Sequence, residues 1–404
     1  MASACVLLTT VIVAILALLA QVFLTPVLTA AGVFRTVAPL SDAFKAKCTQ
    51  HYAAKVEGCE KISLHAESGL LYMACGSIEG RSRWLSGSAG IQSPNGANTD
   101  DISYLAVYDP SKPKDQAFHR VQLEGFDSSR TVAFHGMDVV PSAENKDEVF
   151  IYLVNHLAPL EGSAKDVSAY SSAIEVFVSS LGGHLARHLC TFSHDSILRR
   201  ANDVVGAPDG KSIYFTTNYD PEEYTMPIYA IKQLVAPSMI VGYCHIDDGC
   251  KVALGGMGAP NGIVTSGNGT YYISSIFGPQ GYVVAEQQED NSLVYTELIP
   301  TEVLINDNLS MDEDGAIWVA AFPKAFDLDR AMKDTSLPVP SRAIKASINT
   351  GPDSFFGAKY LVETIAEDDG SFLSYITTVV HDSRRGKLFF HGLTTRALTE
   401  CEYP

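Results

Sequence analysis

The feature that most constrains the fold of this chain is a short pattern that recurs six times. Most copies begin with a polar turn, often containing Gly, and all contain an alternating or β-branched apolar run that suits a strand. The copies lie at residues 66–73, 148–154, 208–215, 267–273, 312–319 and 383–390. A helical period is hard to find along most of the chain. The pattern therefore predicts an all-β protein.

The chain length indicates how the six copies are arranged. About 370 residues follow the apolar N-terminus, which gives roughly 62 residues per copy, enough for a four-stranded blade with long loops. We therefore expect residues 35–404 to form a six-bladed β-propeller, whose radial repetition protects its sheet edges. An irregular pair of β-sandwiches is the alternative, although it would not require six similar hairpins.

Two segments depart from the strand pattern. Residues 82–101 are rich in Ser, Gly and Asn, which predicts a long surface loop that could cover a site. Residues 325–337 carry apolar side chains at spacings of three and four, which predicts a short surface helix.

The N-terminus of the chain is strongly apolar. No charged residue precedes Arg35, and residues 5–24 have only Thr and Gln as polar interruptions, over about the ~20 residues that cross a bilayer. Residues 1–34 are therefore interpreted as a cleaved signal peptide or an uncleaved membrane anchor, with a buried soluble helix as the alternative. Either membrane interpretation sends the chain into the secretory pathway, as a secreted or membrane-anchored protein.

Seven cysteines would then meet an oxidising environment. Cys48 and Cys401 lie near the two ends of the folded part, so a bridge between them would tie the ends into one blade. Cys244 and Cys250 enclose a short polar turn and could close a local loop. If both bridges form, one of the three other cysteines stays unpaired, and spacing does not say which. These three are Cys59, Cys75 and Cys190.

The charge balance excludes one class of partner. Lys and Arg number 29 against 46 Asp and Glu, a formal net charge of −17. Binding of nucleic acid through its phosphates is therefore not expected, and cationic ligands or metal ions are favoured.

Short polar clusters lie just before or within the predicted strands. They span residues 58–61, 134–138, 154–156, 201–204, 260–263 and 306–310. Loops at one end of a propeller converge on its channel, so these clusters can meet in space. Their carboxylate and amide oxygens are the ligands that Ca²⁺ prefers, although each pair taken alone is typical of a turn. The chain has no G-x-S-x-G, H-E-x-x-H or Walker A motif.

Taken in order, the clusters resemble the serum paraoxonase/arylesterase family from Cys48 to Cys401. The strongest match is the run Asp307-Asn308-Leu309-Ser310 followed by residues 315–319. Shorter matches are the His-Gly of His135, the Asn-His of His156, Asn202-Asp203 and Asn261-Gly262-Ile263. The resemblance implies a six-bladed propeller with a terminal disulfide, a retained apolar N-terminus and bound calcium.

The resemblance also implies the roles of individual residues. The implied ligands of a catalytic Ca²⁺ are Glu60, Asn202, Asn261, Asp307 and Asn308. His135 and His156 would form a dyad that activates water, with His135 as the proximal base. The ion would polarise an ester or lactone carbonyl while a neutral imidazole takes the proton from water.

One departure from the family concerns a second, structural calcium. The family carries an acid where this chain has Lys61. Its ammonium group could occupy the position of that ion and pair with Asp203, or Asp138 could restore the missing carboxylate. We expect no second calcium.

Other departures concern the substrate pocket and a sequon. Phe322 stands where the family more often has a polar residue, so the pocket wall is expected to be more apolar. The loop 82–101 resembles the mobile lid of the family, with Trp84 as its anchor or as a packing residue. Asn268 and Asn308 both lie in sequons, and Asn268, in a hairpin turn, is the expected glycosylation site because a channel ligand is inaccessible to a glycan.

The sequence therefore predicts a calcium-dependent hydrolase of lactones and aryl esters, with a small-molecule ester or lactone as substrate. If the N-terminal segment is not cleaved, it would also associate the chain with a membrane. A non-catalytic propeller that calcium merely stabilises, and that binds a partner, is the alternative from another class. A propeller of the strictosidine-synthase type is a third, but the Asp and Asn ligand set argues against it.

Overall fold

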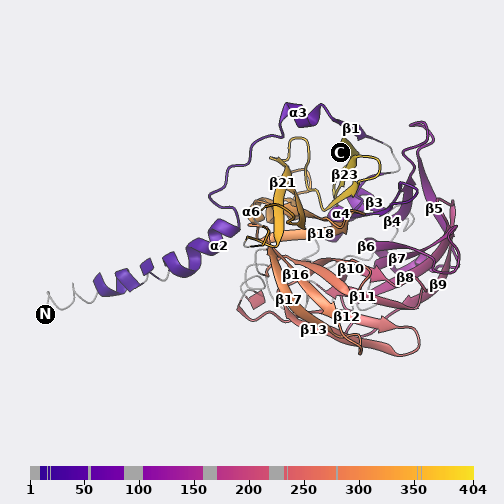
Figure 1. Cartoon of the computed structure of the whole chain (residues 1–404), viewed down its shortest axis with the longest axis horizontal. Helices are drawn as coiled ribbons and strands as arrows, with labels where there is room; N and C mark the ends of the chain where they lie inside the picture. Colours follow the sequence, from indigo (N-terminus) through magenta and orange to yellow (C-terminus); the bar gives the residue numbers. More distant parts are fainter. Residues whose placement is uncertain are drawn as a thin grey trace.

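The structure is a computed structural model, and it describes most of the chain. The described residues are 10–15, 17–18, 20–52, 56–85, 103–157, 171–217, 232–233, 235–278, 281–352, 354–355 and 357–404. They are mostly strands with few helices (Figure 1), which confirms the all-β prediction.

Within this described part, the strands form one sheet of eight and four sheets of four. The eight-stranded sheet contains β2 (Lys61–His65), β3 (Leu70–Gly76), β4 (Ser103–Tyr108), β5 (Phe118–Glu124), β6 (Thr131–Pro141), β7 (Glu148–Leu157), β8 (Ser171–Ser180) and β9 (Leu185–Phe192). It consists of two antiparallel groups, β2 to β5 and β6 to β9, joined by a parallel pairing between the edge strands β5 and β9.

The other sheets are antiparallel groups of four. The first comprises β10 (Ala201–Gly206), β11 (Ser212–Thr217), β12 (Met239–His245) and β13 (Gly249–Met257). The second comprises β14 (Pro260–Thr265), β15 (Thr270–Ser275), β16 (Gly281–Gln287) and β17 (Leu293–Pro300). The next comprises β18 (Ile305–Met311), β19 (Ile317–Phe322), β20 (Ser341–Ile348) and β21 (Tyr360–Asp368). The last joins β22 (Thr378–Asp382), β23 (Lys387–His391) and β24 (Leu398–Glu402) to β1 (Cys48–His51).

Each copy of the sequence pattern supplies the second strand of one such group. These strands are β3, β7, β11, β15, β19 and β23. The first strands of the groups contact one another in a ring, from β2 through β6, β10, β14, β18 and β22 back to β2. Such an arrangement is propeller-like, and it places whatever the first strands carry at the centre.

Disulfides close the fold at three places. Cys48 lies opposite Cys401 in the pairing of β1 with β24, and the two are bonded, which confirms the predicted terminal bridge. The predicted Cys244–Cys250 bridge is also confirmed. Cys59 pairs with Cys75, so Cys190 is the free thiol among the cysteines that the structure describes.

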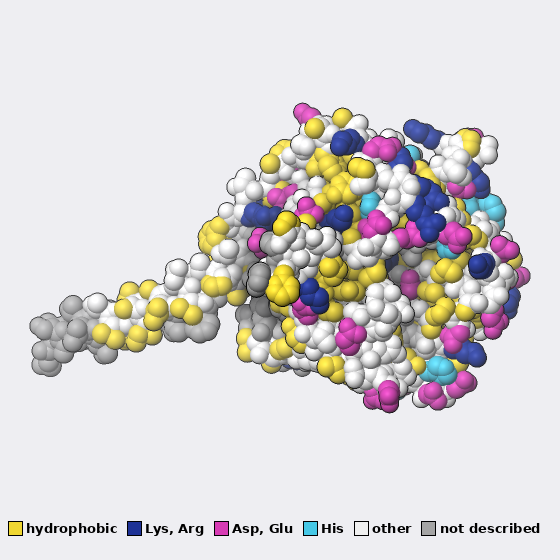
Figure 2. Space-filling view, viewed as in Figure 1, with side chains coloured by type: hydrophobic (Ala, Val, Ile, Leu, Met, Phe, Trp, Pro, Cys, Tyr) yellow, Lys and Arg dark blue, Asp and Glu magenta, His cyan; other side chains and the backbone are white. Residues whose placement is uncertain are grey.

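The N-terminal segment projects from the sheets as short helical pieces (Figure 1), including a π-helix at Ala20–Leu24 and α2 at Thr25–Ala30. Its apolar side chains are largely exposed (Figure 2). No helix in the described ranges is long and apolar enough to cross a membrane. The interpretation of residues 1–34 as a signal peptide or anchor stays a prediction.

Short helices among the described residues accompany the sheets, including α3 (Asp42–Lys45), α4 (Ile78–Leu85) and α6 (Ala325–Lys333). The predicted helix at 325–337 is confirmed, but it ends at Lys333. Residues 82–85, predicted as loop, belong to α4, which begins after Ser77, whose hydroxyl accepts a hydrogen bond from the Gly80 N–H. The rest of the predicted loop, 86–101, and the side chain of Trp84 lie outside the described residues.

Candidate functional site

The first strands of the sheets bring the predicted polar residues together. We call the group the inner cluster, and it consists of Glu60, Lys61, His135, Asn202, Asp203, Asn261, Asp307 and Asn308. Glu60 directly precedes β2, and the others lie on β2, β6, β10, β14 and β18. All of these side chains are buried, so each polar atom needs a partner inside the protein.

Two glycines let the inner strands approach closely enough to form this cluster. A Cβ atom on Gly136 would lie 2.3 Å from the Asn202 carbonyl oxygen, and one on Gly262 would lie 2.6 Å from the Leu309 nitrogen. Any other residue would push β6 from β10, or β14 from β18. In the His-Gly and Asn-Gly motifs, the glycine therefore allows the close strand approach that the preceding functional side chain needs to reach the cluster.

One side of the inner cluster, which we call the open half, presents oxygens without hydrogen-bond partners. The open half consists of Glu60, Asn202, Asn261 and Asp307. Glu60 Oε2, Asn202 Oδ1 and Asn261 Oδ1 are buried and have no hydrogen-bond partner. These three oxygens come from three segments far apart in the sequence. An unpaired buried oxygen costs about 1–3 kcal/mol, so three together indicate a site built for a ligand.

Backbone and side-chain contacts hold Glu60 in place. Asn308 Nδ2 donates to Glu60 Oε1 at 2.6 Å, and Thr377 Oγ1 donates to the Glu60 carbonyl oxygen at 2.6 Å. The Asn308 N–H in turn donates to the Thr377 carbonyl oxygen at 3.2 Å. The predicted ligands Glu60 and Asn308 are thus tied to each other and to the segment before β22. Thr377 was not predicted, because nothing in its local sequence marks it.

Electrostatics also favours a cation in the open half. Burial raises the pKa of Glu60, and burial together with the negative charge of Glu60 raises the pKa of Asp307 well above its usual range. Two buried carboxyl groups that disfavour each other's ionisation are stabilised in the charged form by a bound cation.

The donor set fits Ca²⁺ in type. No group of three or more His, Cys, Asp or Glu side chains suited to a metal occurs in the described residues. The open half instead combines two carboxylates with amide oxygens, which are hard donors of the kind found around calcium. The residues that would hold the ion are therefore the predicted calcium ligands. Of these, Asn308 lies at the edge of the open half.

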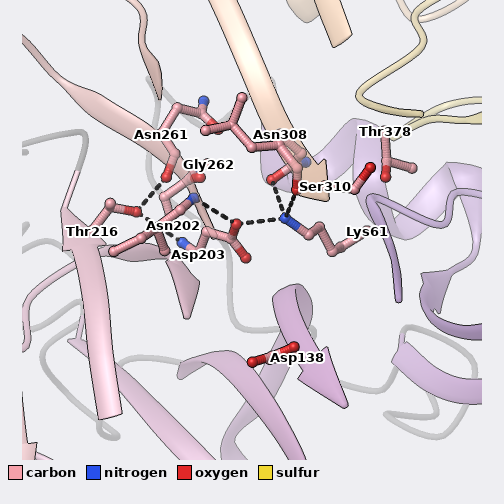
Figure 3. A network of polar contacts seen from close by, with 12 residues as sticks. Lys61, Asp138, Asn202, Asp203, Thr216, Asn261, Gly262, Asn308, Ser310 and Thr378 are labelled. Carbon is pink, nitrogen blue, oxygen red and sulfur yellow. Dashed lines mark hydrogen bonds and ion pairs between the residues drawn. The ribbon is translucent and has the colours of Figure 1, made fainter. Parts of the chain in front are cut away.

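The other side of the inner cluster, which we call the lysine half, contains an ion pair (Figure 3), although one of its oxygens, Asp203 Oδ1, is also buried without a hydrogen-bond partner. It consists of Lys61 and Asp203. Lys61 Nζ lies 2.6 Å from Asp203 Oδ2, 3.0 Å from the Leu309 carbonyl oxygen and 3.5 Å from Asn308 Oδ1. The Ile263 N–H also donates to Asp203 Oδ2 at 3.0 Å. Of the two predicted arrangements around Lys61, the structure forms the pair with Asp203.

Asp138 stands apart from this ion pair (Figure 3). Its oxygens accept from the N–H groups of Val139 at 2.9 Å and Gly206 at 3.0 Å. Burial raises the pKa of Asp138 to about 6, and the negative charge of Asp203 adds to the effect. Asp138 thus does not restore a carboxylate in contact with Lys61.

The two predicted catalytic histidines lie together beside the open half. Their ring centres are 5.2 Å apart. His135 Nε2 lies 3.1 Å from Asn202 Nδ2 and 3.7 Å from Glu60 Oε1. Since an amide N–H only donates, the contact with Asn202 makes Nε2 the nitrogen with the lone pair.

Behind His135, the second ring is held by a hydroxyl group. His156 Nδ1 lies 3.1 Å from Ser172 Oγ, which also accepts from the Ala201 N–H at 3.1 Å. Burial, with nearby positive charge adding to it, lowers the pKa of His135 well below its usual value. Burial and His135 do the same for His156. Both rings are therefore neutral at pH 7, as a general base must be.

An aromatic pair lies near the open half. Phe322 is buried, and its ring meets that of Tyr375 edge to face, with ring centres 5.6 Å apart. The phenol of Tyr375 lies close enough to Asp307 and Glu60 for their charges to raise its pKa further, beyond the effect of burial. Phe322 and Tyr375 therefore form a buried aromatic contact near the cluster, and the prediction that Phe322 makes the substrate pocket more apolar stays a prediction.

The two sequons differ in exposure. Asn308 is 1% exposed, whereas Asn268 is exposed in the turn between β14 and β15. A glycan can reach only the second. Glycosylation of Asn268 stays a prediction.

The sequence of the whole chain was compared with protein families. The family model described as Arylesterase matches residues 88–402, which is more than half of the chain. The chain belongs to the arylesterase family. The family match covers four of the five predicted metal ligands and both histidines; Glu60 lies before it. No curated protein sequence matches this arylesterase-family chain.

Solved structures similar to this arylesterase-family member were also found. The major allergen Mala s 1 of Malassezia sympodialis has 10% identity and a TM-score of 0.50, over 88% of this chain and 95% of that one. A gluconolactonase from Xanthomonas campestris has 13% identity and a TM-score of 0.48, over 91% and 95% of the two chains. At such low identity, a likeness concerns the fold alone.

Proposed function

We propose that this chain is a calcium-dependent hydrolase of lactones and aryl esters, built as a six-bladed propeller. Membership of the arylesterase family supports ester or lactone hydrolysis at a general level. The observation that carries the finer proposal is the set of three unpartnered oxygens, from Glu60, Asn202 and Asn261, beside His135. Four groups of four strands and one double group support the count of six blades.

In this proposal the open half holds one calcium ion. Glu60, Asn202, Asn261 and Asp307 supply oxygens, and Asn308 completes the set from the border with the lysine half. When bound, calcium supplies a positive charge that polarises the substrate carbonyl group. Lys61 already places a cation beside Asp203, so we propose a single calcium rather than two.

His135 is the proposed general base. Its neutral ring has the Nε2 lone pair on the side of Asn202 and Glu60, where a water molecule that displaces the Asn202 N–H can give up a proton. The water oxygen bonds to the carbonyl carbon, and the carbon–oxygen bond to the alcohol or phenol part then breaks. The proton on His135 passes to the departing oxygen. His156, held by Ser172, packs behind His135 and keeps its ring in this orientation.

The cellular location is proposed from the N-terminus and the disulfides. Three disulfides in one chain are typical of an oxidising compartment. We propose that residues 1–34 direct the chain into the secretory pathway, as a secreted or membrane-anchored protein, and that Asn268 is glycosylated there.

The deciding experiment uses the purified chain with an aliphatic lactone and phenyl acetate as substrates. Hydrolysis should disappear with a calcium chelator and return when calcium is added. Retained hydrolysis in the chelator would contradict the role of calcium. A chain that gains thermal stability from calcium but hydrolyses neither substrate would support the non-catalytic binding module instead.

A further inference from the structure

A buried arginine on α4 lies next to the inner cluster and has one nitrogen without a partner. Arg81 is 1% exposed, although guanidinium groups are rarely buried unless paired with acids. Its Nε donates to the Gly58 carbonyl oxygen at 3.2 Å, and its Nη2 donates to the Ala74 carbonyl oxygen at 3.4 Å. Its Nη1 is buried and has no hydrogen-bond partner.

The anchoring of Arg81 is rigid. Gly58 and Ala74 directly precede Cys59 and Cys75, which are joined by a disulfide. The Glu60 N–H donates to the Ala74 carbonyl oxygen at 3.1 Å, so one carbonyl group joins Glu60 and Arg81. The guanidinium plane is therefore fixed by the same segments that fix a proposed metal ligand.

The position of α4 brings Arg81 near the segments that carry the acid and the base of the site. The helix packs against β6, which carries His135, and also against α6. The charge of Arg81 acts on Glu60, His135 and His156, as the shifts of their pKa values show. Burial lowers the pKa of Arg81 to about 10, so the group still carries its positive charge at neutral pH.

We propose that Arg81 binds the acyl oxygens of substrate and product, with Nη1 donating to the carbonyl oxygen and then to the carboxylate. This inference rests on the proposed function for its substrate class. An unpaired N–H group beside the site fits a ligand oxygen, and a guanidinium group suits a carboxylate in particular. An alternative in which Arg81 only ties Gly58 to Ala74 would leave Nη1 without a role.

The test measures carboxylate binding directly, by calorimetry on the calcium-loaded chain with 4-hydroxybutanoate, the acid that a five-membered lactone yields. Arg81→Met should weaken this binding about 10- to 100-fold, as expected for a lost charged hydrogen bond, and should leave binding of phenol, the other type of product, unchanged. Calcium affinity, measured in parallel, should change little. Equal weakening for both ligands, or none for the carboxylate, would overturn the proposal.

A matched control is Arg342→Met. Arg342 is also buried, but it pairs with Glu367 on β21, away from the inner cluster. The Arg342→Met variant should lose stability but keep the wild-type affinity for the carboxylate. If Arg81→Met does not fold, Arg81→Lys replaces it in the test. An ammonium group cannot span both carbonyl groups and also reach the ligand, so this variant should bind the carboxylate more weakly. Wild-type affinity for the carboxylate in Arg81→Lys would overturn the proposal.

The outcomes separate this inference from the proposed function. A wild-type chain that binds the carboxylate through Arg81 but hydrolyses no ester would contradict the hydrolase and retain the binding role. A chain that hydrolyses lactones with unchanged product affinity in Arg81→Met would retain the hydrolase and overturn the role of Arg81.

Discussion

The open half and the lysine half of the inner cluster are built from neighbouring residues on the same strands, yet their polar groups are satisfied in different ways. Glu60 and Lys61 are consecutive, as are Asn202 and Asp203. One member of each pair enters the open half, and the other forms the lysine half. Glu60 directly precedes β2, and Asn202 and Asp203 lie where the pairing of β10 with β11 shifts register.

The difference between the halves lies in where the positive charge comes from. In the lysine half, the ammonium group of Lys61 lies 2.6 Å from Asp203 Oδ2, so the chain carries its own cation. In the open half, burial raises the pKa of Glu60, burial and the charge of Glu60 raise the pKa of Asp307, and three oxygens have no hydrogen-bond partner. The ammonium group of Lys61 is engaged by Asp203 and stabilises the fold, whereas a cation held by the oxygens of the open half would also be available to a substrate. The predictions below test this division.

The largest expected effect is on catalysis in the open half. His135→Gln should lower hydrolysis about 10²- to 10⁴-fold, the usual contribution of a general base. The gain in melting temperature on adding calcium should remain, because His135 is not among the proposed ligands. Rates and melting curves on the same preparation check both parts. His156→Gln should lower hydrolysis less, and unchanged rates in both variants would remove the dyad from the mechanism.

Next in size is the loss of stability from the lysine half. Lys61→Met leaves Asp203 buried without its cation, which should cost about 3–5 kcal/mol in the free energy of unfolding. Urea unfolding at neutral pH measures it. The double variant Lys61→Met with Asp203→Asn should recover part of the loss, since no charge is then left buried. A single variant as stable as the wild type would show that the ion pair does not support the fold.

Replacing the lysine by an acid tests the same half from the opposite direction. Lys61→Asp places two carboxylates where one ion pair was, so this variant should regain stability only when a divalent cation is added. Calcium titration should then find one more ion per chain than in the wild type. An unchanged number of bound ions would mean that the lysine half cannot hold a metal.

A smaller effect is expected from removing calcium from the wild type. At calcium 100-fold above its dissociation constant, the ion should stabilise the chain by about 2.7 kcal/mol, and a chelator should remove this gain. Glu60→Gln should lose most of the calcium-dependent part, whereas the exposed Asn268→Gln should keep it. A chelator-insensitive melting temperature would argue against a metal in the open half.

The sequence predicted the all-β fold because each hairpin pattern is encoded locally. Most of the six copies begin with a turn, such as the one at 66–69, which forms the link between the first and second strands of its group. The parallel pairing of β5 with β9 was not predictable, because it depends on how two finished sheets meet. The Cys59–Cys75 bridge had a usable signal, since the register that pairs Lys61 with Ala74 brings these cysteines together.

The site residues were predictable where their side chains occur in sequence motifs. They were not predictable where a side chain is held by contacts with backbone groups. Asn202, Asn261 and Asp307 come together because their motifs begin successive sheets. Arg81 has no motif, and its partners are carbonyl groups, so only the folded chain reveals it. The composition of residues 82–85 predicts a loop, yet the helix that starts after Ser77 includes them.

The smallest expected effect concerns Asp138, the nearby acid that is not part of the lysine half. Asp138 has a pKa of about 6, raised above the value of about 3.9 in an unfolded chain. Its protonated form is therefore favoured in the folded state. The stability it contributes is present below about pH 4 and is lost as the pH rises through about 6. Since the carboxyl group is only partly shielded, the loss should be about 1–2 kcal/mol.

The variant that isolates this effect is Asp138→Asn, measured by urea unfolding across that range. An amide keeps only one of the two acceptor contacts with Val139 and Gly206, so the variant should be less stable at every pH. The informative quantity is therefore the slope: the difference between wild type and variant should shrink as the pH rises. Glu60 and Asp307 titrate in both proteins and cancel in this difference. If the difference in stability between wild type and variant is the same at every pH, the charge of Lys61 compensates Asp138 as well as Asp203. The lysine half would then include both acids.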